Sequence, residues 1–194
     1  GSVVIPAGVV AKASPDGYSL LVQGAVLWVN SLLRTMPFDI TDFAPITQIT
    51  REASLVVVHP SVPANSIKEF IALAKARPGD LNYGGSPSLG AGSNLAAEQF
   101  AYMAKVNILR IPYKSGGERM TSLLSGEVHF AFITGVLYTQ LPKGKVRFLG
   151  VTTQKPLPLA PDVPPISNTL PGYENRQVGG LFVTRGTPAP IVNR

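Results

Sequence analysis

The chain has 194 residues, 45% of them hydrophobic and 14% charged, which is enough apolar material to fold one large domain or two small ones. It contains no cysteine, so disulfides, zinc–thiolate sites and a cysteine nucleophile are excluded. The net charge of +6 would attract an anionic solute, anionic lipid or nucleic acid. The 17 Lys and Arg residues are scattered without a basic helix, however, so we predict no nucleic-acid partner. No run reaches the roughly 18 apolar residues of a membrane helix.

The first part of the chain predicts helices and strands separated by clear turn signals. In chain order these are the end of a helix at 9–13, a strand at 18–22, a helix at 26–33, and strands at 44–50 and 54–58. Pro15-Asp16-Gly17 stops the first helix. Ser66 stands three residues before Glu69, which is the spacing of a capping box and predicts a helix that ends before Pro78.

Strands and helices continue to alternate in the second part of the chain. The predicted elements are a strand at 81–83, a helix at 94–104, a strand at 108–111, a helix at 118–124, and strands at 128–132, 145–152 and 180–183. The stretch from 154 to 173 is rich in proline and predicted to be irregular, and Thr187-Pro188 predicts another helix start. This alternation predicts an α/β fold with mostly parallel sheets.

The segment from Gly84 to Asn94 follows a predicted strand and opens a predicted helix. Ligands of open α/β sheets bind outside the carboxyl ends of the strands. A helix N-terminus there offers unpaired N–H groups and about half a positive charge, and small residues let an anion approach the backbone. The candidate ligand-binding residues are Ser86, Ser88, Gly92, Ser93 and Asn94. A flexible loop in which Ser93 only caps the helix fits the sequence equally well.

Other predicted strands also end in polar or glycine-containing loops. Gln23, Gly24 and Ala25 follow the strand at 18–22, Tyr113 follows the strand at 108–111, and Thr134 follows the strand at 128–132. We predict these five residues as further ligand contacts. Each strand end alone is weak evidence, but together they favour a binding cleft for a small carboxylate.

Catalytic and metal-binding motifs are missing from the sequence. It has no Gly-x-Ser-x-Gly, dinucleotide-binding or phosphate-loop motif, and its two histidines lack the spacing of a metal site. We therefore predict no metal, no cofactor and no enzymatic activity. An enzyme acting on a carboxylate is the alternative, with His59, His129 and Lys114 as its candidate acids or bases. A non-binding fragment or interaction domain is a third interpretation.

A series of short motifs runs through the chain in order. They are Ala11-Lys12-Ala13-Ser14-Pro15-Asp16-Gly17-Tyr18-Ser19-Leu20-Leu21, Met36-Pro37-Phe38-Asp39, Val57-Val58-His59-Pro60-Ser61-Val62-Pro63, Leu73-Ala74-Lys75-Ala76-Arg77-Pro78-Gly79, Ile111-Pro112-Tyr113-Lys114, Pro161-Asp162-Val163-Pro164 and Gly186-Thr187-Pro188-Ala189-Pro190. The ordered set covers essentially the whole chain and resembles the Bug family, also called the TctC-like receptors of tripartite tricarboxylate transporters.

The resemblance implies a periplasmic-binding-protein-like Venus flytrap with two α/β lobes. Lobe 1 would contain residues 1–56 and 179–194, and lobe 2 residues 57–178. Such a protein would lie in the periplasm, close on a di- or tricarboxylate or related organic acid by hinge motion, and deliver it to membrane transporter subunits. The implied contacts come from the loops at 23–26, 86–94, 112–117 and 133–135.

Some positions depart from the family pattern. The family's first βαβ segment and C-terminal helices have no counterpart here, and residues 1–6 resemble only the end of the first loop, with Val3 where glycine is usual. Gln23 and Ile133 stand where the family often has Thr and Asp. An Asp at 133 could pair with a ligand amine, so Ile133 disfavours an amino-acid ligand and predicts a more hydrophobic acid.

Overall fold

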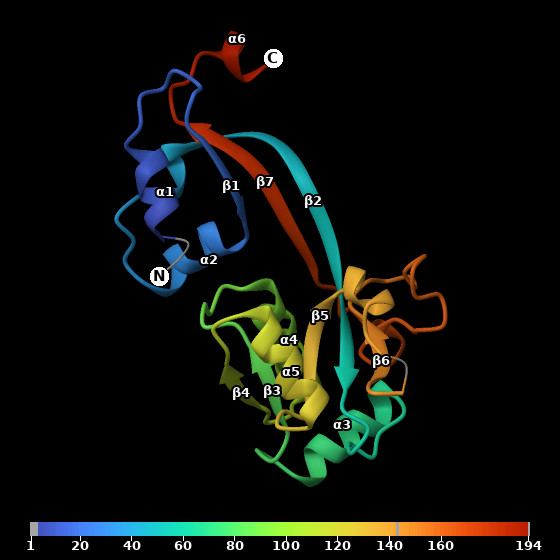
Figure 1. Cartoon of the computed structure of the whole chain (residues 1–194). Helices are drawn as coiled ribbons and strands as arrows, with labels where there is room; N and C mark the ends of the chain where they lie inside the picture. The colour runs from blue at the N-terminus through green and yellow to red at the C-terminus, as the bar shows by residue number, and fades with distance from the viewer. Residues whose placement is uncertain (1–3, 143, 194) are drawn as a thin grey trace. The chain divides into compact units, whose positions relative to one another are not determined.

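The computed structural model describes residues 4–142 and 144–193, so Val3 lies outside the described residues (Figure 1). The chain forms two compact units, each considered by itself below. Unit 1 contains the residues up to Arg51 and those from Gln177 onward, and unit 2 is Glu52–Arg176. The chain thus passes between the units once inside a long strand and once near the start of another. The boundaries predicted from the sequence, 56/57 and 178/179, lie slightly later in the chain.

Unit 1 has a small apolar core between short helices and an antiparallel strand pair. Its elements are α1 (Val4–Ala11), β1 (Leu20–Gly24), α2 (Val26–Leu33), the 3-10 turn η1 (Ile40–Asp42), the first part of β2 (Phe43–Val58), nearly all of β7 (Arg176–Thr184) and α6 (Ala189–Val192). Strand β1 runs antiparallel to β7, with Leu20 opposite Val183. The core includes Leu21, Leu27 and Phe43, which come from β1, α2 and β2.

Unit 2 is a sheet with helices on both faces. Its elements are the rest of β2, α3 (Ile67–Ala76), β3 (Asn82–Gly85), α4 (Gly92–Ala104), β4 (Leu109–Pro112), α5 (Gly116–Ser125), β5 (Phe130–Thr134), the 3-10 turn η2 (Gly135–Thr139), β6 (Arg147–Val151) and the 3-10 turn η3 (Ile166–Asn168). The strand order is β2-β5-β3-β4, and β6 also pairs with β2.

Strand direction in the sheets is mixed. In unit 2, β3 runs parallel to β4 and to β5, as expected for strands joined by helical crossovers. Strand β2, however, runs antiparallel to β5 and β6, and in unit 1 β1 runs antiparallel to β7. The expected parallel arrangement is therefore found among β3, β4 and β5. The direction of the other strands relative to their neighbours depends on which strands pair, and the alternation of helices and strands along the chain does not specify the pairing.

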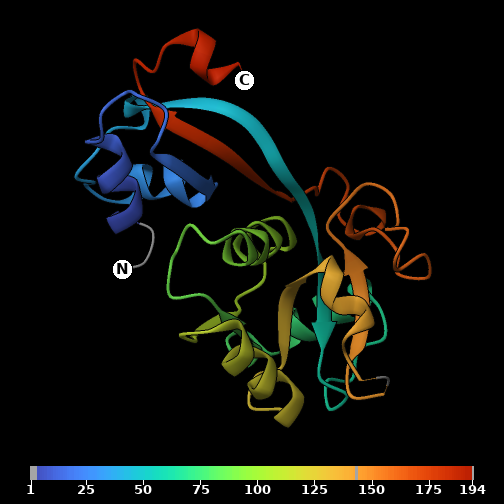
Figure 2. The ribbon, with the colours of Figure 1, turned by 45° about the horizontal axis from the view of Figure 1, so that its top comes forward.

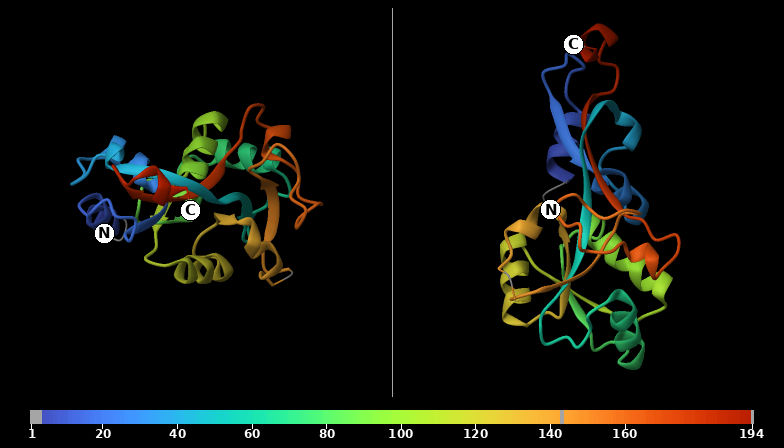
Figure 3. Two further views of the ribbon diagram at one scale, coloured as in Figure 1. Left: turned by 90° about the horizontal axis from the view of Figure 1, so that it is seen from above. Right: turned by 90° about the vertical axis from the view of Figure 1, so that its right-hand side faces the viewer.

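The unit 2 sheet buries apolar side chains on both faces. Successive residues in Leu55–Val58 and Phe130–Ile133 point alternately to opposite faces. Phe130 and Phe132 pack with residues of α3 and α4, whereas Ile133 packs on the face that α5 covers. The right-hand view of Figure 3 shows α3 and α4 on one side of the sheet and α5 on the other. Burial on both faces explains why these strands read as continuous apolar runs.

Several elements differ in extent from their predictions. Strand β2 is a single strand from Phe43 to Val58, where two strands were predicted, because Arg51–Ala53 contains no turn-forming residue. Helix α4 begins at Gly92 and α5 at Gly116, each two residues earlier than predicted. Helix α2 has the predicted bounds. The earlier start of α4 puts candidate ligand-binding residues into its first turn.

Within the described ranges, every helix falls short of the length and apolar character needed to cross a bilayer.

Candidate functional site

The predicted ligand-binding residues of unit 2 lie along one edge of its sheet. Strands β3, β4 and β5 are parallel neighbours, so their carboxyl ends, at Gly85, Pro112 and Thr134, are on the same edge. The loop from β3 into α4, green in Figure 2, and the turn from β4 into α5 start there. This edge brings together Ser86, Ser88, Gly92, Ser93, Asn94, Tyr113 and Thr134.

Asn94 holds the loop between β3 and α4 in place. Its side chain is only 1% exposed, and its amide Nδ2 donates to the carbonyl oxygens of Ser86, at 2.9 Å, and Ser88, at 2.7 Å. Its Oδ1 accepts the Ser86 N–H at 2.9 Å. Both polar atoms of the amide are thus occupied by the loop backbone. Asn94 is a positioning residue whose amide has no free atom for a ligand.

The two serines of this loop have different hydrogen-bond states. Ser86 Oγ accepts the Ser88 N–H at 3.3 Å, and the Ser86 carbonyl also receives Arg110 Nη1 at 2.9 Å. Ser88 Oγ is buried and has no hydrogen-bond partner among the described residues. A buried hydroxyl without a partner costs about 1–3 kcal/mol. Ser88 is therefore a group for which a ligand atom or an ordered water would be the natural partner.

The N-termini of α4 and α5 both open at this edge. The N–H groups of Gly92 and Ser93 in α4, and of Gly116 and Gly117 in α5, form no hydrogen bond with any residue that the structure describes. In α5, the hydroxyl oxygen of Ser115 accepts the N–H of Glu118, the residue after Gly117. Unpaired N–H groups at the positive end of a helix favour an anion by about 0.3–1 kcal/mol per charge at exposed sites.

Arg119 connects these two helix ends. It lies in the first turns of α5, and its Nη1 donates to Ser93 Oγ at 3.1 Å. Its Nε is buried without a partner among residues 4–142 and 144–193, and this burial lowers the pKa of the guanidinium. The side chain crosses the end of β3 at Gly84, where a Cβ would stand 2.6 Å from Arg119 Cγ. A glycine is required at 84 for this approach.

Arg110 and Arg119 were not predicted as site residues. Arg110 crosses Gly85 in the same way, because a Cβ on Gly85 would stand 2.7 Å from Arg110 Cγ. A signal for Arg119 was present in the sequence. It follows a glycine pair at a helix start, where acidic side chains are favoured over basic ones. A basic residue in that position is the less favourable choice.

Tyr113 directly follows β4, and Thr134 is the last residue of β5. The Tyr113 N–H donates to the Gly85 carbonyl at 3.0 Å, and its hydroxyl is buried without a partner in the described part of the chain. Thr134 is half-buried and gives no side-chain cap to η2.

Ile133 is 1% exposed within the apolar core. Contrary to the expectation from the sequence, its side chain therefore does not shape a ligand-binding surface. Strand alternation turns it inward.

Gln23, Gly24 and Ala25 end β1 in unit 1. Gln23 Oε1 accepts the Gly24 N–H at 3.3 Å, and a Cβ on Gly24 would stand 3.1 Å from the Val178 carbonyl oxygen. Ala25 precedes the first residue of α2 and gives that helix no side-chain cap. Gln23 and Gly24 are thus the last residues of β1, paired with Gly180 and Gly179, and not part of the loop predicted after residue 22.

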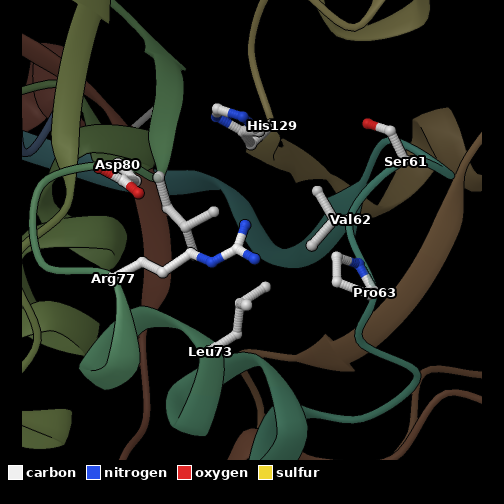
Figure 4. Close-up of a pocket in the computed structure, with 8 residues that line it drawn as sticks. Ser61, Val62, Pro63, Leu73, Arg77, Asp80 and His129 are labelled. Atoms are coloured by element: carbon white, nitrogen blue, oxygen red, sulfur yellow. The ribbon is translucent and has the colours of Figure 1, made fainter.

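A cavity of about 360 Å³ lies at the opposite edge of the unit 2 sheet (Figure 4). It is lined by Ser61, Val62, Pro63, Leu73, Arg77, Asp80, Leu81 and His129, and the Arg77 guanidinium projects into its middle. None of the predicted ligand-binding residues lines it. The C-terminal end of α3 borders this cavity and Asp80 adds a carboxylate, so its field is less suited to an anion than that of the strand-end edge.

Of the candidates for an enzymatic acid or base, the two histidines are neighbours, since the His59 N–H donates to the His129 carbonyl at 2.9 Å, whereas Lys114 lies apart from them. His59 Nδ1 lies 2.7 Å from Ser61 Oγ, and His129 Nδ1 lies 3.0 Å from Asn82 Oδ1. Both histidines are at the edge where β3 and β5 begin, whereas Lys114 follows β4 at the other edge. Among the described residues, no group of three or more His, Cys, Asp or Glu side chains could hold a metal ion.

Comparisons with known proteins identify related sequences and structures. A profile of the family described as "Tripartite tricarboxylate transporter family receptor" matches residues 1–194. The UPF0065 protein in the tcbD-tcbE intergenic region of Pseudomonas sp. (strain P51) is 31% identical over 197 residues, which cover 98% of this chain and 58% of that protein.

Two solved structures are similar over nearly the whole chain. A protein of R. palustris with adipate is 35% identical with a TM-score of 0.87, covering 97% of this chain and 64% of that one. MatC from Rhodopseudomonas palustris with bound malate is 26% identical with a TM-score of 0.81, covering 97% and 66%. The predicted α/β binding-protein fold is thereby confirmed. The chain spans less than two thirds of the length of each of these proteins.

Proposed function

Because the chain belongs to the tripartite tricarboxylate transporter receptor family, we propose that it binds a small organic di- or tricarboxylate and delivers it to the membrane subunits of such a transporter. The observation that carries the proposal is the edge of unit 2 where β3, β4 and β5 end. There two helix N-termini with unpaired N–H groups and a partly buried guanidinium favour negative charge. The adipate and malate bound to two similar proteins are dicarboxylates, which supports this ligand class.

The proposed ligand contacts follow from the state of each residue. In unit 2 they are the N–H groups of Gly92, Ser93, Gly116 and Gly117 and the hydroxyls of Ser86, Ser88, Tyr113 and Thr134. Asn94 acts by holding the loop. In unit 1 the proposed contacts are Gln23, Gly24 and Ala25. The two units correspond to the two lobes of a receptor that closes on its ligand by hinge motion.

The proposed receptor works in the periplasm and performs no chemistry on its ligand. Membership of a receptor family and the separation of Lys114 from His59 and His129 both argue against a carboxylate-processing enzyme. The location is checked by fractionating cells that express the whole protein. Recovery in the cytoplasmic fraction would contradict it.

Titration calorimetry with adipate, malate, citrate and the neutral adipamide tests the binding proposal. The parent chain is expected to bind at least one of the acids and not adipamide. Gly116→Pro removes one unpaired N–H at a position where proline fits, because Gly116 is the first residue of α5 and Ser115 before it is extended. It should weaken binding roughly tenfold or more, since a hydrogen bond to a charged group contributes about 1.5–3 kcal/mol.

Gly116→Ala is the matched control. It keeps the N–H, and its Cβ would meet only the tip of Arg119, at 4.0 Å. It should bind like the parent. A folded parent chain that binds none of the acids, or that binds adipamide equally well, contradicts the proposed function.

A further inference from the structure

We propose that Arg119 is the direct counter-ion of one ligand carboxylate, and that unit 2 thereby selects ligands with an ionised acid group and no amine at that end. This inference rests on the proposed function and names the chemistry of the same site. It assigns recognition of the ligand's negative charge to one side chain, in addition to the backbone N–H groups.

The position of Arg119 is unfavourable for a cation without a bound anion. It lies near the start of α5 and contacts Ser93 in the first turn of α4, so its charge faces the positive ends of two helix dipoles. Acidic side chains are the stabilising choice at such positions. A carboxylate placed beside the guanidinium would reverse this repulsion and would also meet the unpaired N–H groups of both helices.

The acids on α4 and α5, the two helices that Arg119 joins, do not supply that charge. Glu118 is exposed, and its carboxylate accepts the Lys114 N–H at 3.1 Å. Glu98 accepts the hydroxyl of Tyr83 at 2.9 Å. The ion pair within 4.0 Å found among the described residues is Glu174–Arg176, so Arg119 has none with them. Burial alone lowers the pKa of its guanidinium, and no acid compensates.

The hydrogen-bonding groups around Arg119 are also left for a ligand. One donor, Nη1, is engaged by the neutral hydroxyl of Ser93. The planar guanidinium presents further donors in a fork that matches the two oxygens of a carboxylate. At the same edge of the sheet, the hydroxyls of Ser88 and Tyr113 are buried without a partner in the part of the chain that the structure describes. An acid group can satisfy such donors, whereas an ammonium group cannot accept from them.

The test compares Arg119→Gln with Lys114→Gln, using whichever of adipate, malate and citrate the parent binds most tightly. Both variants lose one positive charge from the same segment, but Lys114 is exposed. Arg119→Gln should weaken binding roughly 10- to 100-fold. Lys114→Gln should stay within about twofold of the parent. Arg119→Lys, which keeps the charge and loses the fork, should fall between them.

A second measurement separates a ligand contact from a structural role. Without ligand, Arg119→Gln should melt at the same temperature as the parent or higher, because it removes a partly buried and uncompensated charge. With ligand it should lose most of the rise in melting temperature that the parent shows. A lower melting temperature without ligand and an unchanged rise with ligand would assign Arg119 to structure alone and overturn the inference.

The outcomes distinguish the two proposals. If the parent binds an acid and Arg119→Gln binds it within threefold, the counter-ion assignment fails and the receptor function stands. If the parent also binds an amino dicarboxylate such as aspartate as tightly as malate, the exclusion of an amine fails. If the folded parent binds none of the acids, both proposals fail.

Discussion

At the scale of single residues, Asn94 shows how a predicted ligand contact acquires a different role. A loop of small residues leaves several backbone N–H and C=O groups that the loop cannot pair internally. The Asn94 amide satisfies the N–H and C=O of Ser86 and the C=O of Ser88 at once. An amide has both donors and an acceptor, so it can do this where a hydroxyl or carboxylate cannot. The sequence indicated a polar residue but not the direction of its side chain.

Replacement of Asn94 should therefore affect stability as well as binding. Asn94→Ala should lower the free energy of unfolding by about 1–3 kcal/mol, because buried backbone groups lose their partners. Asn94→Asp retains an acceptor for the Ser86 N–H but loses both donors and adds negative charge beside the proposed carboxylate site. It should bind the acid more weakly than Asn94→Ala. Urea denaturation and calorimetry measure the two effects, and parent-like stability of Asn94→Ala would refute this role.

At the scale of elements, α3 and α5 begin with the same cap. The hydroxyls of Ser66 and Ser115 accept the N–H groups of Glu69 and Glu118, at 3.2 Å in both helices. Each glutamate reaches back to the N–H of the residue before the cap, at 2.7 and 3.1 Å. The predicted cap by Ser66 is confirmed in α3, but the complete capping box is not formed, because the Glu69 carboxylate accepts the N–H of Asn65 and not that of Ser66. In α5 the two glycines after Ser115 disfavour a helix, yet the cap and the packing of α5 start it at Gly116.

Because α3 and α5 have the same kind of cap, comparing variants of the two caps separates effects on stability from effects on binding. Ser66→Ala and Ser115→Ala should each lower the free energy of unfolding by about 1 kcal/mol, since each leaves one N–H without its capping oxygen. Only Ser115→Ala should also weaken binding of the acid, because α5 carries Arg119 and the unpaired N–H groups of the proposed site. Chemical denaturation and calorimetry on both variants check this. Equal losses of affinity would show that the start of α5 has no special part in binding.

At the scale of the whole molecule, the two units differ in how much core they contain. In unit 2 the apolar clusters on both faces of the sheet draw all their buried residues from within Glu52–Arg176, a continuous stretch of chain. Unit 1 is assembled from two separate stretches around a smaller cluster. A continuous segment with its own core meets the main physical requirement for independent folding.

The segment 52–176 should therefore fold when produced alone. It should unfold in one cooperative transition in urea, followed by circular dichroism, and should bind the acid more weakly than the whole chain because the contacts proposed for Gln23–Ala25 are missing. A gradual, non-cooperative loss of signal would show that the cores of unit 2 depend on the rest of the chain.

The features that the sequence by itself determined are those encoded over a few neighbouring residues. Apolar periodicity and turn residues located nearly every helix and strand, with α2 at its exact bounds, and the Ser66–Glu69 spacing identified a cap. Small polar residues after successive strands marked the edge of unit 2 where a ligand is proposed. An ordered series of local motifs was enough to indicate the receptor family that the comparisons confirm.

Tertiary structure alone decided which distant groups meet. The antiparallel neighbours of β2 and the inward direction of Ile133 follow from sheet order and register, and the contact of Arg119 with Ser93 joins residues 26 positions apart. Local periodicity carries no information about these pairings, because they are selected by packing among elements far apart in the chain. The fold class could therefore be predicted, while the contact that brings Arg119 to the start of α4 could not.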